Sequence, residues 1–277
     1  MNDLAIVNAK KIEALLGDFR PKVGLILGSG LGSLVERIQV IARISYHDCE
    51  GLFTSTVIGH KGEFVFGFLD KVPVMCMNGR VHLYEGATPL QLLTPIRMMK
   101  ALGCVSLLLT NSSGSLRSDW LPGTMVLIKD QLNFTGISIL AGPNQEQYGP
   151  RFVSMENAYD SILRSHVHQS AKALNLELKD GVYCGVMGPQ YETPTEIKMY
   201  GQLGGEMVGM STVHEVIAAR HAGLKVVGLT LITNLGAGLS ENKVNHQEVI
   251  EMAALAGGKL AGLLQHVFEH HGAALAS

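Results

Sequence analysis

The chain has 277 residues, of which 47% are hydrophobic and 17% are charged, and its formal net charge is −2 at pH 7. This composition predicts a globular protein with a substantial core, and the length suits one large domain over residues 1–277. The nearly neutral charge argues against a nucleic-acid partner, because a protein that binds nucleic acid presents a basic face.

Strand-like apolar runs alternate with helical patterns along the chain. In chain order we expect a helix over 4–16, strands Val23–Leu27, Phe64–Leu69 and Val72–Met77, helix Pro89–Leu102, strands Val105–Thr110 and Thr124–Ile128, helix Tyr159–Leu174, strand Gly181–Val186, helices Pro194–Leu203 and Val213–Ala222, strand Lys225–Thr233 and helix His246–Glu269. The alternation predicts an α/β fold with a central mixed β-sheet flanked by helices on both faces. The segment Thr135–Arg151 lacks periodicity, and we expect a functional or interfacial loop there.

Cysteine, histidine and hydropathy patterns narrow the class further. The four cysteines are widely spaced without a C-x-x-C pair, so they predict neither a disulfide framework nor a zinc site. The eleven histidines are scattered without a His-Glu-x-x-His motif, and we expect no metal site. No basic and apolar leader opens the chain, and no apolar run reaches about 18 residues, so we expect a cytoplasmic protein with no membrane partner.

A glycine-rich turn follows the first predicted strand, with the sequence Leu27-Gly28-Ser29-Gly30-Leu31-Gly32. Glycines let the backbone turn sharply there and approach an anion, which exposed N–H groups and a hydroxyl can hold. The dinucleotide fingerprint needs a glycine where Ser33 stands, and no Gly-Lys-Ser/Thr follows for a Walker motif. The turn therefore predicts a phosphate-binding loop of another kind.

Polar clusters come directly after several other predicted strands. They are Asn78–Gly86, Asn111–Ser115, Gly188–Thr193 and Asn234. In open α/β sheets ligands bind beyond the carboxyl ends of strands, so we expect these clusters to converge on one pocket.

Two of these clusters carry groups suited to an anion. Arg80 and His82 are two residues apart, so in an extended segment they face the same side. A guanidinium fork and an imidazole suit phosphate, although a solvated arginine and a surface histidine are the ordinary alternative. The proximity of the glycine-rich turn and of a second Ser/Gly loop favours the anion site.

Four further segments allow a functional or a structural interpretation. Tyr191 and Glu192 suit the face and the N–H edge of a heterocycle, whereas Thr193 and Glu196 suit a helix cap. Ser211 suits either a helix N-cap or an anion contact. Asn234 ends the strongest strand pattern, where a pocket-facing role avoids the cost of burying an unpaired amide. His246, at the start of the last helix, is by itself more typical of a surface residue.

As a set, these motifs resemble the trimeric, low-molecular-mass purine nucleoside phosphorylase family from about Pro21 to Phe268. The matching motifs are Ile26–Gly32, Gly79-Arg80-Val81-His82-Leu83-Tyr84-Glu85-Gly86, Thr110-Asn111, Gly188-Pro189-Gln190-Tyr191-Glu192-Thr193, Val208-Gly209-Met210-Ser211-Thr212-Val213 and Ile232-Thr233-Asn234. The resemblance implies a nucleoside phosphorylase-like fold and an enzyme of purine salvage, a pentosyltransferase. Its reaction would be phosphorolysis of purine (2′-deoxy)ribonucleosides to the free base and (2-deoxy)ribose 1-phosphate, without a cofactor and with orthophosphate as co-substrate.

The resemblance also implies a role for each matching residue. Phosphate would be held by Ser29, His60, Arg80, His82, Ser211 and the backbone N–H of Ser112. The nucleoside would be held by Tyr84, Phe152, Tyr191, Glu192, Met210, Asn234 and His246. The catalytic residues would be His82, Glu192 and Asn234. Phe152 would reach into the site of a neighbouring subunit, so the implied assembly is a homotrimer.

The sequence departs from the family pattern where Ser112 and Ser113 replace two alanines and where His214 replaces a proline. These departures leave the choice among inosine, guanosine and xanthosine open, while Asn234 favours 6-oxopurines over 6-aminopurines. Two alternatives remain: a methylthioadenosine phosphorylase-like enzyme, and a nucleoside-binding module without catalysis. A dinucleotide-dependent oxidoreductase is a weaker alternative, because only the glycine-rich turn suggests it.

Overall fold

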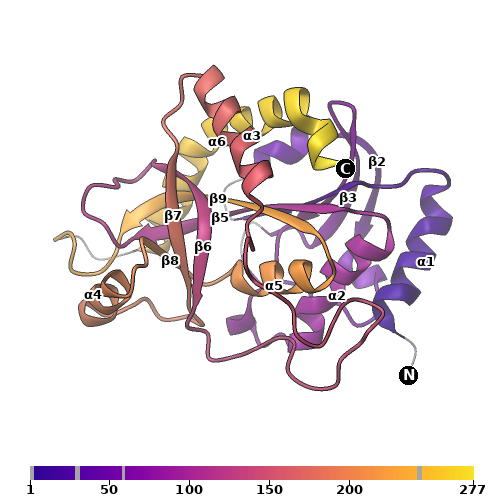
Figure 1. Cartoon of the computed structure of the whole chain (residues 1–277), viewed down its shortest axis with the longest axis horizontal. Helices are drawn as coiled ribbons and strands as arrows, with labels where there is room; N and C mark the ends of the chain where they lie inside the picture. The colour runs from indigo at the N-terminus through magenta and orange to yellow at the C-terminus, as the bar shows by residue number, and fades with distance from the viewer. Residues whose placement is uncertain (1–2, 29–31, 58–59, 242–244) are drawn as a thin grey trace.

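A mixed β-sheet runs through the middle of the molecule (Figure 1), whose computed structural model describes residues 3–28, 32–57, 60–241 and 245–277, without the side chains of residues 33 and 246–248. The helices are α1 (Leu4–Leu16), α2 (Pro89–Ala101), α3 (Ser161–Ala173), α4 (Pro194–Gln202), α5 (Val213–His221) and α6 (His246–Leu275). The strands are β1 (Val23–Leu27), β2 (Gln39–Ser45), β3 (Glu63–Leu69), β4 (Val72–Asn78), β5 (Ser106–Ser115), β6 (Met125–Asn133), β7 (Lys179–Gly185), β8 (Met207–Gly209) and β9 (Lys225–Leu235).

The strands lie in the order β2-β3-β4-β1-β5-β8-β7-β6-β9, and β9 also pairs with β5. The second pairing joins β5, β8, β7, β6 and β9 into a closed ring, which removes the free edge on that side of the sheet. Parallel pairs (β1 with β4 and β5, and β5 with β9) stand beside antiparallel ones (β2 with β3, and β6 with β9). The predicted mixed sheet is confirmed.

Helices cover both faces of this sheet, as expected (Figure 1). Alternate residues of a strand point to opposite faces. Leu25 of β1 therefore packs in the cluster that contains Leu163 of α3 and Leu264 of α6. Ile26, the next residue, packs in the opposite cluster, which holds residues of α1, α2 and α5. The core thus consists of two layers that share one sheet.

The predicted element boundaries agree with the structure within a few residues in most places. The helix expected over 4–16 is α1 at the same bounds, and strand Val23–Leu27 is β1. Two strands of the sheet, β2 and β8, are not among the predicted elements. β2 is largely exposed and its apolar residues do not alternate cleanly, while β8 has only three residues. Both strands are held by pairing with other strands of the sheet, and a local sequence pattern does not record that pairing.

The Asn111–Ser115 segment corrects one expectation. The analysis placed it as a loop after a strand ending at Thr110, but it continues β5 to Ser115. The backbone of this segment stays extended because β9 pairs with it in parallel, with a register shift between Ser113 and Gly114. The loop over Thr135–Arg151 is confirmed as a segment without helix or strand.

Candidate active site

The carboxyl ends of four strands meet at one edge of the sheet, because β1, β4, β5 and β9 run parallel. A cavity of about 120 Å³ opens there, as predicted for an α/β sheet. It brings together eight of the predicted site residues: Arg80, His82, Ser112, Tyr191, Glu192, Met210, Ser211 and Asn234. Gly28, Asn111, Ser113, Gly114, Val208, Gly209, Thr233 and Val249 complete its lining.

Arg80 is almost fully buried, with only 1% of its surface exposed. A network of hydrogen bonds and an ion pair holds its guanidinium. Its Nη2 donates to the Thr110 carbonyl (2.6 Å), and its Nη1 donates to Thr212 Oγ1 (3.2 Å) and pairs with Glu215 (3.4 Å). Asn111 Nδ2 donates to the same Thr212 oxygen (2.6 Å). Arg80 Nε has no hydrogen-bond partner within the described residues. The guanidinium is therefore fixed in place at the cavity wall, as an anion site requires.

His82 is oriented by Glu85, three residues further on. Glu85 Oε1 accepts from the His82 backbone N–H (2.8 Å) and lies 3.0 Å from His82 Nδ1. Burial opposes ionisation of Glu85, but hydrogen bonds from His82, Thr56 and Ser55 outweigh it and lower its pKa to about 2. An ionised carboxylate can only accept, so Nδ1 of His82 carries its proton and Nε2 is left for the cavity.

His60 and Tyr84 lie against His82 rather than in the cavity lining. The His60 ring stacks on His82 at 5.4 Å between centroids, and the Tyr84 ring stacks on His82 at 4.8 Å. His60 Nδ1 lies 2.8 Å from the Arg80 carbonyl. Burial, and then the neighbouring His82, lower the pKa of His60 to about 4, so this imidazole is neutral at pH 7. Both rings therefore stand beside His82, outside the cavity lining.

Ser211 is not the N-cap of α5, which was the structural interpretation of this residue. The N-cap of α5 is Thr212, which has a φ of +75°, and Ser211 precedes it. Tyr183 OH accepts from the Ser211 backbone N–H (3.3 Å) and lies 3.5 Å from its Oγ. Burial raises the pKa of Tyr183 to about 12, so its hydroxyl stays protonated. Ser211 is therefore presented to the cavity by a buried tyrosine.

Tyr191 and Glu192 lie in the segment that leads into α4. The predicted cap is confirmed, because Thr193 and Glu196 form a reciprocal capping box at the start of this helix. That role leaves Glu192 for the cavity, which it lines. Burial raises the pKa of Glu192. A carboxylate that is poorly hydrated gains more from an N–H donor than a solvated one.

Asn234 is oriented by its own neighbours at the end of β9. Its Nδ2 donates to the Leu235 carbonyl (3.1 Å), and its Oδ1 lies 3.0 Å from Thr233 Oγ1. A methyl group at Gly114 would lie 3.0 Å from Asn234 Nδ2, so the glycine leaves room for the amide. The amide is held at the cavity wall by contacts from two adjacent strands.

The three remaining predicted site residues are Phe152, Ser29 and His246. Phe152 is 89% exposed and lies outside the cavity lining. Ser29 lies outside the described residues, as does the side chain of His246. Val249, one turn into α6 from His246, does line the cavity.

Four supporting residues escaped the sequence analysis: Glu85, Tyr183, Thr212 and Glu215. Glu85 had a local signal, because a carboxylate three residues after His82 suits a capping box. Tyr183 and Glu215 lie on elements that only the fold brings next to Ser211 and Arg80. No local pattern reports such contacts.

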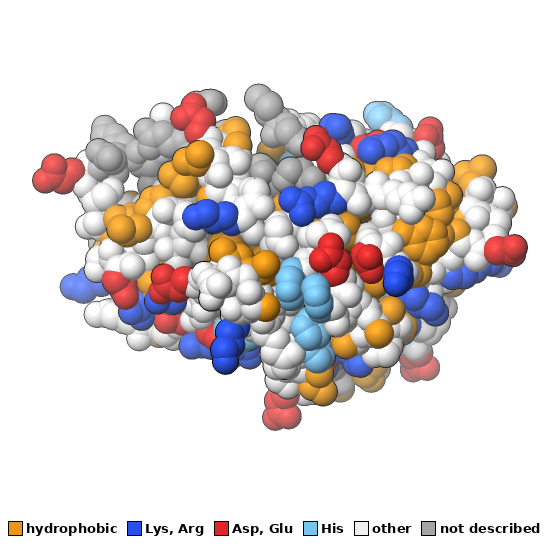
Figure 2. All heavy atoms as spheres, turned by 90° about the horizontal axis from the view of Figure 1, so that it is seen from above, with side chains coloured by type: hydrophobic (Ala, Val, Ile, Leu, Met, Phe, Trp, Pro, Cys, Tyr) orange, Lys and Arg blue, Asp and Glu red, His pale blue; other side chains and the backbone are white. Residues whose placement is uncertain are grey.

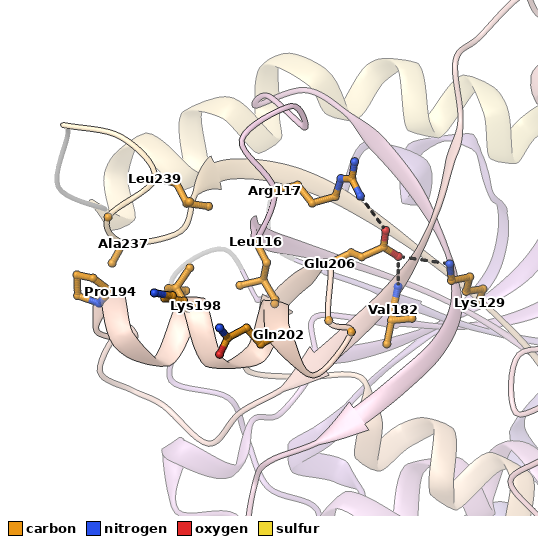
Figure 3. Close-up of a pocket in the computed structure, with 15 residues that line it drawn as sticks. Leu116, Arg117, Lys129, Val182, Pro194, Lys198, Gln202, Glu206, Ala237 and Leu239 are labelled. Atoms are coloured by element: carbon orange, nitrogen blue, oxygen red, sulfur yellow. Dashed lines mark hydrogen bonds and ion pairs between the residues drawn. The ribbon is translucent and has the colours of Figure 1, made fainter.

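A separate hollow of about 830 Å³ lies beside α4 (Figure 3). Its acidic residue, Glu206, pairs with Arg117 and Lys129, both at 3.4 Å, and accepts from the Val182 backbone N–H (3.2 Å). These charges satisfy one another, as in a surface ion-pair network. The hollow therefore lacks the rigid convergent groups of the 120 Å³ cavity.

Histidines gather on the face covered by α3 and α6 (Figure 2), far along the chain from the cavity residues. His166 stacks on His271 at 4.5 Å, and His266 stacks on His270 at 3.9 Å. Among the residues that the structure describes, no group of three or more His, Cys, Asp or Glu side chains is arranged to hold a metal ion. Within the same residues, no helix is both long and apolar enough to cross a membrane.

Known proteins match this chain along most of its length. Residues 22–269 match the family model described as the Phosphorylase superfamily. The chain is 44% identical to purine nucleoside phosphorylase 1 of Bacillus subtilis over 232 residues, which is 84% of this chain and 86% of the relative. It is 41% identical to the purine nucleoside phosphorylase of Bos taurus over 248 residues, which is 87% of this chain and 86% of the relative.

Solved structures agree in fold and in sequence. The Schistosoma mansoni purine nucleoside phosphorylase in complex with adenosine matches with a TM-score of 0.91 and 36% identity over 96% of both chains. The complex with inosine matches with a TM-score of 0.89 and 35% identity over the same share. Since the matches extend over nearly all of the chain that forms the sheet and the cavity, this chain belongs to the purine nucleoside phosphorylase family of the Phosphorylase superfamily.

Proposed function

We propose that this protein catalyses phosphorolysis of purine (2′-deoxy)ribonucleosides, giving a free purine and (2-deoxy)ribose 1-phosphate. The observation that carries the proposal is one cavity that holds both anion-binding donors and a carboxylate–amide pair. The first set suits orthophosphate, and the second suits the polar edge of a purine.

At the phosphate end, the buried Arg80 supplies a permanent charge and the Ser211 hydroxyl adds a donor, while His82 Nε2, which carries no proton when Nδ1 does, accepts from the O–H of a hydrogen phosphate. The proposed set is Ser29, His60, Arg80, His82, Ser211 and the Ser112 backbone N–H. Arg80 and His82 are held by Glu215 and Glu85, so they need little reorganisation when phosphate binds. A phosphate dianion held there is both a nucleophile and a counter-charge for the sugar.

At the sugar and base end, Tyr84, the Met210 backbone and His246 are proposed to hold the ribose hydroxyls. Tyr191 packs on the purine, and Glu192 accepts from its N1–H. Asn234 uses one amide N–H for the Leu235 carbonyl. Its second N–H is offered to N7, where negative charge grows as the base leaves.

The bond changes follow from these placements. The C1′–N9 bond breaks with its electron pair moving to the purine, and the sugar becomes an oxocarbenium-like cation. A phosphate oxygen then forms the new bond to C1′, and the purine anion takes a proton from solvent. Stabilising both charges in the transition state is the work of the enzyme. Orthophosphate is the co-substrate, and these steps call on no organic cofactor.

We propose a preference for 6-oxopurines, inosine and guanosine, with xanthosine as a further candidate. The remaining amide N–H of Asn234 can be shared between N7 and a 6-oxo group, which both accept, whereas an aspartate there would favour a 6-amino group. The matched Schistosoma structures are complexes with inosine, guanosine and adenosine. These complexes support a purine nucleoside as substrate without separating the two base classes.

The test is phosphate-dependent release of base from inosine, guanosine, xanthosine, adenosine and methylthioadenosine. We expect the 6-oxopurine nucleosides to have the higher kcat/KM, and Asn234→Asp to shift the ratio toward adenosine. A preference for methylthioadenosine would support that alternative activity instead. Binding of inosine without phosphate-dependent turnover would support a non-catalytic nucleoside-binding module.

We further propose a homotrimer in which Phe152 completes the site of the neighbouring subunit. Phe152 exposes 89% of its surface, more than any other large hydrophobic residue in the described part of the chain, so it is available to a neighbouring subunit. It follows the irregular loop 135–151, which extends from the end of β6 beyond the sheet.

A further inference from the structure

A second cavity, of about 310 Å³, lies between the first half of α2 and the loop 135–151. It shares none of its lining residues with the catalytic cavity. Leu93, Ile139 and Leu140 form an apolar part of its wall, and Arg97 and His221 form a polar part. Its volume is at the lower end of the range of roughly 300–1,000 Å³ for small-molecule sites.

Arg97 is a buried cation without an anion to match it. Only 6% of its surface is exposed. Nη1 donates to the neutral amide oxygen of Gln145 (2.6 Å), and the guanidinium lies 4.4 Å from the centre of the Tyr148 ring. Nε has no hydrogen-bond partner in the described part of the chain, where Arg97 also forms no ion pair. A buried guanidinium is costly unless charge and hydrogen bonds compensate it.

The acidic residue that acts on Arg97 is already engaged elsewhere. Asp3 influences the guanidinium electrostatically, but its Oδ1 caps α1 at the Ala5 N–H (2.9 Å). Its Oδ2 accepts from Gln147 (2.7 Å). Burial lowers the pKa of Arg97, and the more distant Asp3 only partly offsets that effect. The charge of Arg97 is therefore only partly compensated, and the cavity wall stays net positive.

His221 lies on the same wall. It is 3% exposed, and its Nε2 lies 3.3 Å from Asn144 Oδ1. Burial and the charge of Arg97 lower the pKa of His221. An anion placed in the cavity would offset the charge of Arg97.

We propose that this cavity binds a small organic anion, with a carboxylate or phosphate group on Arg97 and a hydrocarbon part against Leu93, Ile139 and Leu140. The planar guanidinium matches either oxyanion with two parallel hydrogen bonds. The bound anion would tie α2, which follows the Arg80–Tyr84 segment, to the loop that precedes Phe152.

The test is calorimetric titration of the whole protein with benzoate, phenyl phosphate and the neutral benzyl alcohol. Gln145→Glu replaces the amide oxygen that accepts from Arg97 with a carboxylate of the protein itself. This carboxylate competes with the ligand for the guanidinium. We expect it to weaken binding of the anions by about tenfold or more and to raise the Tm. The matched control is Gln91→Glu, which adds the same charge to the first turn of α2 within its capping box and is expected to change binding less than about twofold.

Crystals soaked with 4-bromobenzoate locate the ligand independently through the bromine anomalous signal. We expect a peak in the 310 Å³ cavity with the carboxylate on Arg97. Whichever of benzoate and phenyl phosphate binds more tightly identifies the preferred head group. Equal binding by wild type and Gln145→Glu would overturn the proposal, since both keep the catalytic anion site. So would binding of benzyl alcohol as tight as benzoate, or no binding of either anion at millimolar concentration.

Discussion

Glu85 shows how one carboxylate can organise several functional groups. It accepts from the backbone and imidazole of His82, and its other oxygen accepts from the backbone N–H and hydroxyl of Thr56. The side chain is only 1% exposed. Its lowered pKa therefore reports a network that is stable only while Glu85 is ionised.

This network predicts a pH-dependent stability difference between wild type and Glu85→Gln. The folded-state pKa, about 2, lies below the ordinary value of 4.5. The stabilisation is therefore complete above pH 4.5 and is lost as the pH falls toward 2. The shift corresponds to roughly 3 kcal/mol. Urea unfolding should show that the gap between the two proteins shrinks below pH 4.5.

The control for this measurement is Glu50→Gln, which removes an exposed pair with Lys11 at 3.8 Å. Exposed pairs contribute about 0–1 kcal/mol, so its gap should stay small at every pH. A Glu85→Gln gap that did not change with pH would contradict the network.

At the scale of single residues, the sequence was a good guide to the cavity wall and a poor guide to its support. Arg80, His82, Glu192 and Asn234 were predicted and do line the cavity. Glu215, which pairs with Arg80, is 135 positions away along the chain and could not be predicted from it. Support of this kind depends on packing between elements rather than on local pattern.

At the scale of elements, the pairing of β5 with β9 shapes the base end of the site. Their register shifts between Ser113 and Gly114, which lies opposite Asn234. The shift and the missing side chain of the glycine together leave space for the amide of Asn234. The polar segment Asn111–Ser115 has a turn-like composition, yet it forms part of β5 because it pairs with β9.

Gly114→Ala should reduce turnover more than stability. The added methyl group would lie 3.0 Å from Asn234 Nδ2, so the amide must shift by a few tenths of an ångström. We expect kcat to fall by about tenfold, since small misplacements of a catalytic group are costly. The Tm should change little because a flexible side chain absorbs the contact. Steady-state kinetics with inosine and a thermal melt test both points.

Gly201→Ala is the matched control for this substitution. Gly201 lies in α4 with no atom within 4 Å of the added methyl group. It should leave kcat unchanged and raise stability by up to about 1 kcal/mol. Full activity in Gly114→Ala would mean that Asn234 does not need its present position.

At the scale of the whole molecule, two features bear on assembly: the exposed side chain of Phe152 and the closed ring of strands. The ring β5-β8-β7-β6-β9 leaves no free strand edge among these five strands. An assembly on this side would therefore use side chains, not strand addition. Phe152 is the most exposed large hydrophobic residue in the described part of the chain.

Subunit complementation tests the proposed trimer. Phe152→Ala and Asn234→Ala should each be poorly active, because each removes one half of every site. Mixed trimers would contain some sites with Asn234 from one subunit and Phe152 from its neighbour. We therefore expect the co-expressed variants to have more activity than the sum of the separate proteins.

A matched mixture of Phe152→Ala with the double variant Phe152→Ala/Asn234→Ala contains no intact pair and should show no gain. Native mass spectrometry would establish that subunits have mixed. Mixed trimers without a gain in activity would show that Phe152 does not serve the neighbouring site.

By itself the sequence determined the alternation of helices and strands, the mixed sheet and half of the residues of the cavity wall. These depend on local periodicity and on short motifs, which a linear chain records directly. The tertiary structure alone decided that β5 continues to Ser115, that β9 closes the ring, and that Arg97 is buried without an ion pair among the described residues. Each of those depends on contacts between segments far apart in the chain, where packing overrides local preference.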